Sequence, residues 1–319
     1  MRVGKASILT DMENIKIYKK VNFVKPVMVA GWPGMGNVAL GTVEYLRKKL
    51  GAVKFAQIQI DELSALDSVI VEDGMAKLPR PPSYTFYYAK NADMIIFEAQ
   101  AQLPGQSGIS LLNKVLDLAL EFKVARIYTG AAFPMPMGHK EEPEVYCAAS
   151  KESLKGTLAK FGVKMMDEGH IFGLNGLLLG FAEKKNIEAI CLLATMPQYA
   201  ISLPNPKASG AIVEVLSKIL NFKVDLKELN DYTKDMDSKM EIIEDKVKDI
   251  FPIEDQRREK AAPSEEKKIP NYIVEKIEKL FREAALDKKK AINLKMELDR
   301  WDLYGAYEDR FLDLFKENQ

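Results

Sequence analysis

The sequence predicts an α/β fold in which a mainly parallel sheet is covered by helices on both faces, followed by a charged helical region. Short apolar runs alternate with segments of helical periodicity through the first 222 residues. The last 97 residues then hold 46 of the 92 charged side chains. This change in composition predicts two domains, residues 1–222 and 223–319.

The first strand and helix are joined by a glycine-rich turn. Val27–Ala30 is a short apolar run, typical of a buried strand, and leads directly into Gly31–Gly36. Asn37 is expected to cap a helix over Val38–Leu50, whose apolar residues recur at helical spacing. This order places backbone N–H groups at a helix N-terminus, where an anion or a partner's backbone can be held.

The later elements continue the alternation. We expect strands at residues 55–60, 84–89, 94–98, 125–130 and 189–194, and a strand entering a turn at 69–74. Helices are expected from Gly105 and over 150–160, 176–185 and 208–220. Loops that follow parallel strands gather at one edge of the sheet. The loops at Gly31–Asn37, at His139 and at Pro197–Lys207 are therefore expected to share one surface.

The second region has a seven-residue period. Leu226 to Ile250 carries apolar residues at both core positions of about four heptads, which predicts a coiled-coil-like helix that needs a partner. The partner is either another part of this chain or a second copy, and we expect a homo-oligomer. Residues 251–270 have the composition of a flexible linker, and two more amphipathic helices follow it.

Composition excludes several classes of partner. Lys plus Arg and Asp plus Glu both number 46, so no net charge draws the protein to nucleic acid or to an anionic membrane. No window approaches the roughly 20 apolar residues of a membrane span. We expect a cytoplasmic protein in which Cys147 and Cys191 are both reduced.

No catalytic arrangement stands out. Gly34–Ala39 matches a dinucleotide-binding turn, and Asp61 or Glu62 could bind a ribose, but Pro33 has no N–H to offer a pyrophosphate. The acidic loop around His139 is more typical of solvent-exposed charge than of a metal site. We therefore expect no catalytic residue, no metal and no cofactor. The alternative is a nucleotide- or nucleoside-binding enzyme, ATP-grasp-like or phosphorylase-like, that uses the Gly31–Gly36 loop.

Three loop motifs together resemble the proteasome assembly chaperone family, in the prokaryotic branch of the chaperone-2 type. They are Gly31-Trp32-Pro33-Gly34-Met35-Gly36-Asn37-Val38, Gly173-Leu174-Asn175-Gly176-Leu177-Leu178 and Pro204-Asn205-Pro206-Lys207-Ala208-Ser209. The resemblance covers roughly residues 10–225. It implies a three-layer α/β/α domain similar to nucleoside phosphorylases, self-association, and a non-enzymatic role in binding proteasome α-subunits. Such chaperones often end in a hydrophobic residue, Tyr and any residue, whereas this sequence ends Lys-Glu-Asn-Gln, so we expect contact through a surface.

The candidate partner- or ligand-binding residues come from the first and third motifs. A purely structural role is equally open, since the glycines permit a tight turn, Trp32 could anchor the core, and the two prolines could fix a helix start. The candidates are Gly31, Trp32, Pro33, Gly34, Met35, Gly36, Asn37, Pro204, Asn205, Pro206 and Lys207.

Overall fold

The computed structural model describes residues 14–60, 68–250, 271–286 and 290–300, and the single positions 303, 307, 310, 311 and 314. The chain forms two compact units, residues 1–252 and 253–319. The expected linker at 251–270 and the expected ribose-binding acids at 61–62 lie outside the described residues. In the described part, no helix combines the length and apolarity that crossing a membrane requires.

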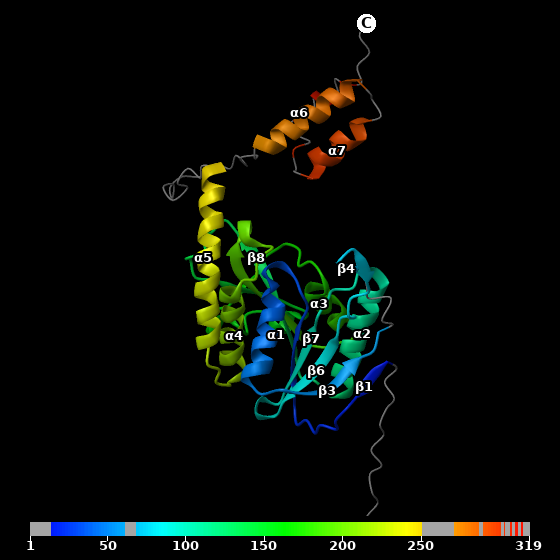
Figure 1. The fold of residues 1–319 in the computed structure, drawn as a ribbon, viewed down its shortest axis with the longest axis vertical. Helices are drawn as coiled ribbons and strands as arrows, with labels where there is room; N and C mark the ends of the chain where they lie inside the picture. Colours follow the sequence, from blue (N-terminus) through cyan, green and yellow to red (C-terminus); the bar gives the residue numbers. More distant parts are fainter. Residues whose placement is uncertain are drawn as a thin grey trace, which may run out of the picture. The chain divides into compact units, whose positions relative to one another are not determined.

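The first unit is built on a nine-stranded sheet with the order β1-β3-β6-β7-β2-β8-β11-β9-β10 (Figure 1). Its four central strands, β7, β2, β8 and β11, are parallel, as predicted. The strands are β1 (Ile15–Ile17), β2 (Val27–Gly31), β3 (Val53–Ile58), β6 (Tyr84–Ala89), β7 (Met94–Ala99), β8 (Ile127–Met135), β9 (Val145–Ala149), β10 (Lys164–Met165) and β11 (Ala189–Pro197).

Helices cover both faces of the sheet and give the three-layer α/β/α architecture. Successive residues of a strand point to opposite faces, so Met28 and Ala30 enter one core while Val29 enters the other. The first core lies under α2 (Gly105–Glu121) and α3 (Leu174–Lys184), and the second lies under α1 (Val38–Lys49) and α4 (Pro206–Leu220). Both faces are buried, which explains why the central strands are continuous apolar runs.

Three local expectations were wrong or incomplete. The outer strands β3, β6 and β9 run antiparallel to their inner neighbours. Residues 69–74 do form the predicted strand and turn, but β4 (Ile70–Glu72) pairs with β5 (Met75–Lys77) in a hairpin separate from the main sheet. Residues 150–160 form two short 3-10 turns, at Glu152–Leu154 and Ala159–Phe161, instead of a helix.

The charged helix α5 (Lys227–Ile250) belongs to the first unit, where it runs alongside α4 (Figure 1). Leu229 joins the core under α1 and α4, while Met236 and Met240 pack on the 3-10 turn η6 (Gln198–Ala200). The described part of the heptad seam therefore finds its partner within the chain. The compositional change at residue 222 does not coincide with the end of this unit.

The second unit contains α6 (Asn271–Leu286) and α7 (Ala291–Arg300), drawn in orange and red in Figure 1. It has an apolar core of its own. Arg310 makes two hydrogen bonds to the carboxylate of Glu278 and lies 4.2 Å from the ring centroid of Phe281. The core residues of this unit are Ile277, Phe281, Ala284, Ala291, Leu294, Leu298, Leu303 and Phe311.

The packing of α5 on the first unit can be tested by truncating one buried and one exposed side chain of this helix. We expect Met236→Ala to lower the free energy of unfolding by about 2 kcal/mol, the lower end of the range for a buried methionine, because its cluster is small. Ile242→Ala, on the exposed side of the same helix, should change it by less than about 0.5 kcal/mol. Urea unfolding measures both, and the reverse order of effects would contradict this packing.

Candidate functional site

The predicted loop begins with two residues that serve packing. A Cβ atom added at Gly31 would lie 2.6 Å from the carbonyl oxygen of Ala39, so the strand and helix approach too closely for any side chain. Trp32 is fully buried and packs on Phe97, with ring centroids 5.0 Å apart. Gly31 and Trp32 therefore have geometry that fits the purely structural role that the sequence left open. The exposed part of the loop starts after them.

A buried amide at the start of α3 holds the loop from one side. The backbone N–H of Trp32 donates to Asn175 Oδ1 at 3.0 Å, and Asn175 Nδ2 donates to the carbonyl of Trp32 at 3.1 Å. Thr129 Oγ1 also donates to Asn175 Oδ1, at 3.1 Å. We call these three hydrogen bonds the Asn175 clamp. It joins the first and second sequence motifs.

Gln102 extends this contact by one residue along the loop. Its Nε2 donates to the carbonyl of Pro33 at 2.6 Å, and its Oε1 accepts from the backbone N–H of Leu174 at 2.9 Å. The side-chain amide thus bridges the loop to the same helix start. Sequence reasoning did not identify Gln102, and it quoted Asn175 only as part of a motif. The sequence signal that could have identified Asn175 is its position between Gly173 and Gly176 at the start of a predicted helix.

The third motif holds the loop from its other side. The N–H of Gly36 donates to the carbonyl of Ile201 at 2.8 Å, and the N–H of Asn205 donates to the carbonyl of Gly36 at 2.7 Å. Asn205 Oδ1 also accepts from Ala208 N–H and caps α4, with Pro206 in the first turn. The structure thus brings the first and third motifs into direct contact.

Only part of the predicted set is accessible. Gly36 has φ +62°, in the left-handed region that favours glycine, and a Cβ there would lie 2.8 Å from Met196 Sδ and 3.2 Å from Asn205 Cβ. Asn37 also has positive φ, +47°, and its side chain makes no capping bond, contrary to expectation. Gly31, Trp32, Gly36, Asn205 and Pro206 are buried, Pro33, Pro204 and Lys207 are partly exposed, and Gly34, Met35 and Asn37 are exposed.

Gly34–Asn37 forms a ridge between two hollows. On one side is a hollow of about 370 Å³, here called the apolar crevice, whose lining includes no Lys, Arg, Asp or Glu. Its walls include Met35, Ala131, Phe133, Met166, Phe172 and Leu193. On the other side is a hollow of about 360 Å³, here called the polar hollow, lined among others by Asn37, Glu44, Tyr45, Lys48, Pro204 and Tyr232. Burial, and to a lesser extent Glu98, raises the pKa of Glu44.

The His139 loop also reaches this edge, but its polar groups serve to attach α5. His139 Nδ1 lies 2.5 Å from Glu244 Oε2, and the Tyr199 hydroxyl donates to the same oxygen at 2.6 Å. Burial, reinforced by this bond to a carboxylate, raises the pKa of Tyr199. Lys207 ties the loop to the third motif, since its Nζ lies 3.1 Å from the Glu142 carboxylate and 3.2 to 3.3 Å from three backbone carbonyls.

The backbone in and beside the ridge is poorly arranged to cradle a phosphate. The N–H groups of Trp32, Gly36 and Val38 all donate within the chain, to Asn175, Ile201 and Met35 respectively. A phosphate site at a helix start uses such N–H groups for its ligand. Within the described residues, no group of three or more His, Cys, Asp or Glu side chains is placed to bind a metal.

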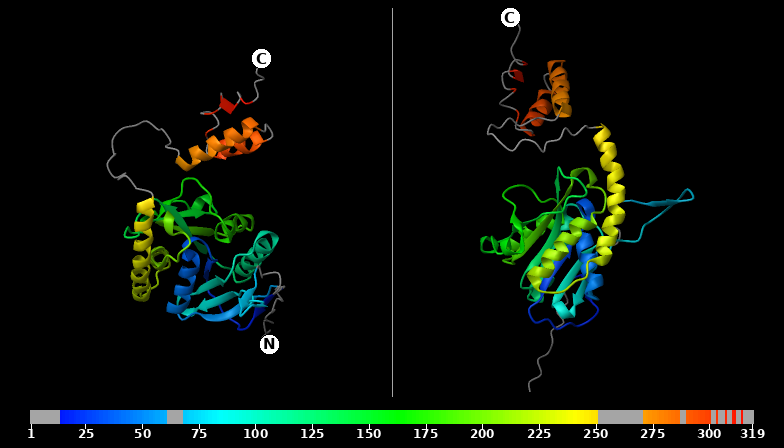
Figure 2. Two further views of the ribbon diagram at one scale, coloured as in Figure 1. Left: turned by 45° about the horizontal axis from the view of Figure 1, so that its top comes forward. Right: turned by 90° about the vertical axis from the view of Figure 1, so that its left-hand side faces the viewer.

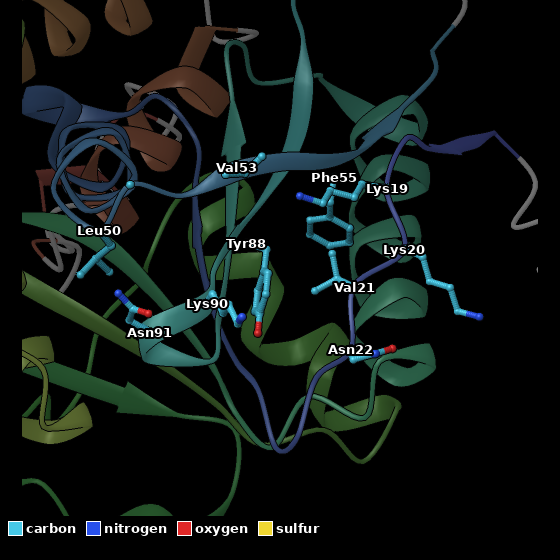
Figure 3. A pocket seen from close by; sticks show the side chains of 11 residues that line it. Lys19, Lys20, Val21, Asn22, Leu50, Val53, Phe55, Tyr88, Lys90 and Asn91 are labelled. Atoms are coloured by element: carbon cyan, nitrogen blue, oxygen red, sulfur yellow. The ribbon is translucent and has the colours of Figure 1, made fainter.

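A further pocket of about 420 Å³ lies at the opposite edge of the sheet (Figure 3). Lys19, Lys20 and Lys90 line it, and none of the predicted site residues does. Figure 3 shows the rings of Phe55 and Tyr88 inside it and Lys20 pointing away from them. Surface lysines of this kind are screened by water and salt, so they do not by themselves define a site.

Comparison with known proteins identifies the family. The PAC2 family matches residues 28–244, which include the ridge, both hollows and most of α5. The chain belongs to this family. It is also similar to the uncharacterized protein MJ1210 of Methanocaldococcus jannaschii, with 27% identity over 233 residues, 71% of this chain and 88% of that protein.

Solved structures share the fold of the first unit. The crystal structure of Pyrococcus furiosus PbaB, described as an archaeal proteasome activator, matches with a TM-score of 0.62 and 26% identity, covering 72% of this chain and 98% of that one. Pyrococcus furiosus PbaA, described as an archaeal homolog of proteasome-assembly chaperone, matches with a TM-score of 0.57 and 22% identity, covering 72% of this chain and 96% of that one.

The Asn175 clamp predicts a large stability effect from a single amide. Asn175→Ala leaves the buried N–H and C=O of Trp32 and the Thr129 hydroxyl without these partners, so we expect the free energy of unfolding to fall by about 3 kcal/mol. The matched control is Asn113→Ala in α2, whose amide makes one bond to the Ile109 carbonyl, and about 1 kcal/mol or less is expected. Urea unfolding gives both values, and equal effects would refute a special role for the clamp.

Proposed function

We propose that this chain is a non-enzymatic, self-associating binding protein that acts in the manner of a proteasome assembly chaperone, with proteasome α-subunits as its partner. Membership in the PAC2 family supports this proposal, as does the likeness to PbaB at 26% identity. The observation that carries it is the ridge, which is fixed from both sides yet exposes Gly34, Met35 and Asn37. Such a role would be exercised in the cytoplasm.

A fixed, exposed ridge suits a protein partner. Rigid surfaces lose little conformational freedom on binding, so more of the contact energy remains as affinity. Asn175 and Gln102 hold one side of the loop and Asn205 holds the other, and the N–H of Asn37 donates to the Gly34 carbonyl at 2.9 Å within the ridge itself. We infer that the partner contacts the ridge and the polar hollow, where an aromatic ring, a lysine and a glutamate offer varied contacts.

The alternative, a nucleotide- or nucleoside-binding enzyme using the Gly31–Gly36 loop, has less support. It needs free N–H groups at the helix start, and those of Gly36 and Val38 donate within the chain. A thermal-shift screen of the purified protein with adenine nucleotides, nicotinamide cofactors and nucleosides tests it. A saturable stabilisation by one of them would favour the enzyme over the binding protein.

The proposed partner surface can be tested by changing the charge and the aromatic contact that the polar hollow offers. The double variant Lys48→Glu with Tyr232→Arg changes two exposed side chains of the polar hollow without touching the core. We expect it to weaken binding to purified proteasome α-subunits at least tenfold, because an interface loses an aromatic contact and gains an unfavourable charge. Isothermal titration calorimetry measures the dissociation constant.

The matched control is Lys54→Glu with Tyr18→Arg, an exposed lysine and tyrosine at the other side of the sheet. This pair should bind α-subunits as the unchanged protein does. If the unchanged protein shows no binding to α-subunits, the proposed partner is wrong. If both double variants bind normally, the partner is right but the polar hollow is not its site.

A further inference from the structure

The hairpin formed by β4 and β5 projects from the first unit as an apolar finger. The right-hand view of Figure 2 shows it leaving the body of the molecule. We call residues 69–78 the finger. Of the 15 large apolar side chains that are exposed in the described residues, five lie in it. They are Val69, Ile70, Val71, Met75 and Leu78. Such a concentration in ten residues marks a surface that is covered in use.

The pairing of the two strands sorts these side chains onto two faces. Val71 lies opposite Ala76, so Val69 and Leu78 share their face, and all four side chains are apolar and exposed. The other face carries Ile70 and Met75 with Glu72 and Lys77, which form an ion pair of 2.7 Å. The finger therefore has one wholly apolar face, and its three charged residues, Glu72, Asp73 and Lys77, lie on the other face and at the tip.

The finger is a regular hairpin, but its apolar face needs a packing partner. Asp73 and Gly74 at its tip have φ of +50° and +77°, as a tight two-residue hairpin turn requires. An isolated two-stranded hairpin is only marginally stable in water and needs a packed face. The described residues of the first unit do not supply one, because Val71 and Leu78 are 66% and 63% exposed.

The base of the finger stands at the same edge of the sheet as the ridge. The N–H of Ser83 donates to Gln100 Oε1 at 2.9 Å, and the N–H of Gln100 donates to the Ser83 carbonyl at 3.0 Å. Gln102, two residues further on, bonds to Pro33 in the ridge loop. One edge of this chain therefore carries both an apolar projection and the apolar crevice, and Phe172 at the crevice is 78% exposed.

We propose that the finger of one copy seats its Val69, Val71 and Leu78 face in the apolar crevice of a second copy. This inference rests on the self-association in the proposed function and names its surfaces. A second copy is the occupant because the chain itself carries both halves of the contact. The two halves match in polarity, since neither the Val69, Val71, Ala76 and Leu78 face nor the crevice lining contains Lys, Arg, Asp or Glu. The contact is heterologous, so repeating it closes a ring or continues as a filament.

The test uses one variant for each half of the contact. The finger variant carries Val71→Glu and Leu78→Glu, and the crevice variant carries Phe172→Glu. All three side chains are exposed, so folding should be retained and circular dichroism checks this. Sedimentation velocity of the full chain should show that each variant self-associates at least about a hundredfold more weakly than the unchanged protein, because a charge would be buried in an apolar contact. Ile242→Glu, an exposed apolar position on α5, should associate normally.

Mixing the two variants distinguishes binding of the finger in the crevice from self-association through any other surface. A finger variant keeps an intact crevice and a crevice variant keeps an intact finger, so an equimolar mixture should form dimers and stop there. If the unchanged protein is a monomer at every concentration, the finger contact and the proposed self-association both fail, while α-subunit binding is judged by its own titration. Association that survives in the crevice variant overturns the crevice as the receptor. Association that survives in the finger variant overturns the finger.

Discussion

The arrangement of the candidate site depends on the buried side-chain amide of Asn175. Its Oδ1 accepts from the Trp32 N–H and its Nδ2 donates to the Trp32 carbonyl, so it satisfies both backbone groups of a fully buried residue. Leaving such groups unpaired away from water is costly, so the loop cannot shift without breaking the clamp. Because Trp32 is also packed in the core, the next residues are forced to emerge as an exposed ridge.

The position of the ridge follows from the strand order. β2 lies between β7 and β8, with which it runs parallel, and the chain leaves its carboxyl end through the glycine loop. In open α/β sheets, crevices form beyond the carboxyl ends of such strands. The two hollows beside Gly34–Asn37 lie there. The sheet thus determines where the site is, and the loop determines its shape.

Much of the fold and the meeting of the loops could be predicted, because both follow from local pattern and one topological rule. The alternation of strands and helices predicted the layers. The rule that loops after parallel strands gather at one edge of the sheet predicted that Gly31–Asn37 and Pro197–Lys207 share one surface. The antiparallel direction of the outer strands and the separate hairpin formed by β4 and β5 were not predicted. The residue pattern of a strand does not determine which strand it pairs with or in which direction. The heptad seam correctly required a partner, but its spacing could not say that η6 of the same chain would supply it. Nor could spacing show that Asn175 bonds to Trp32, 143 residues away.

The rigidity of the ridge bears on how its two sides could work together. Coupling between binding sites requires an element with two arrangements that both ligands bias. The loop is held by Asn175 and Gln102 on the side of the apolar crevice and by Asn205 on the other, so moving it toward either side would break at least one of these hydrogen bonds. Contacts made in the apolar crevice and in the polar hollow should therefore add without cooperativity. The two proposed partners, a second copy in the apolar crevice and an α-subunit at the polar hollow, would then bind independently, although the two hollows share a single loop.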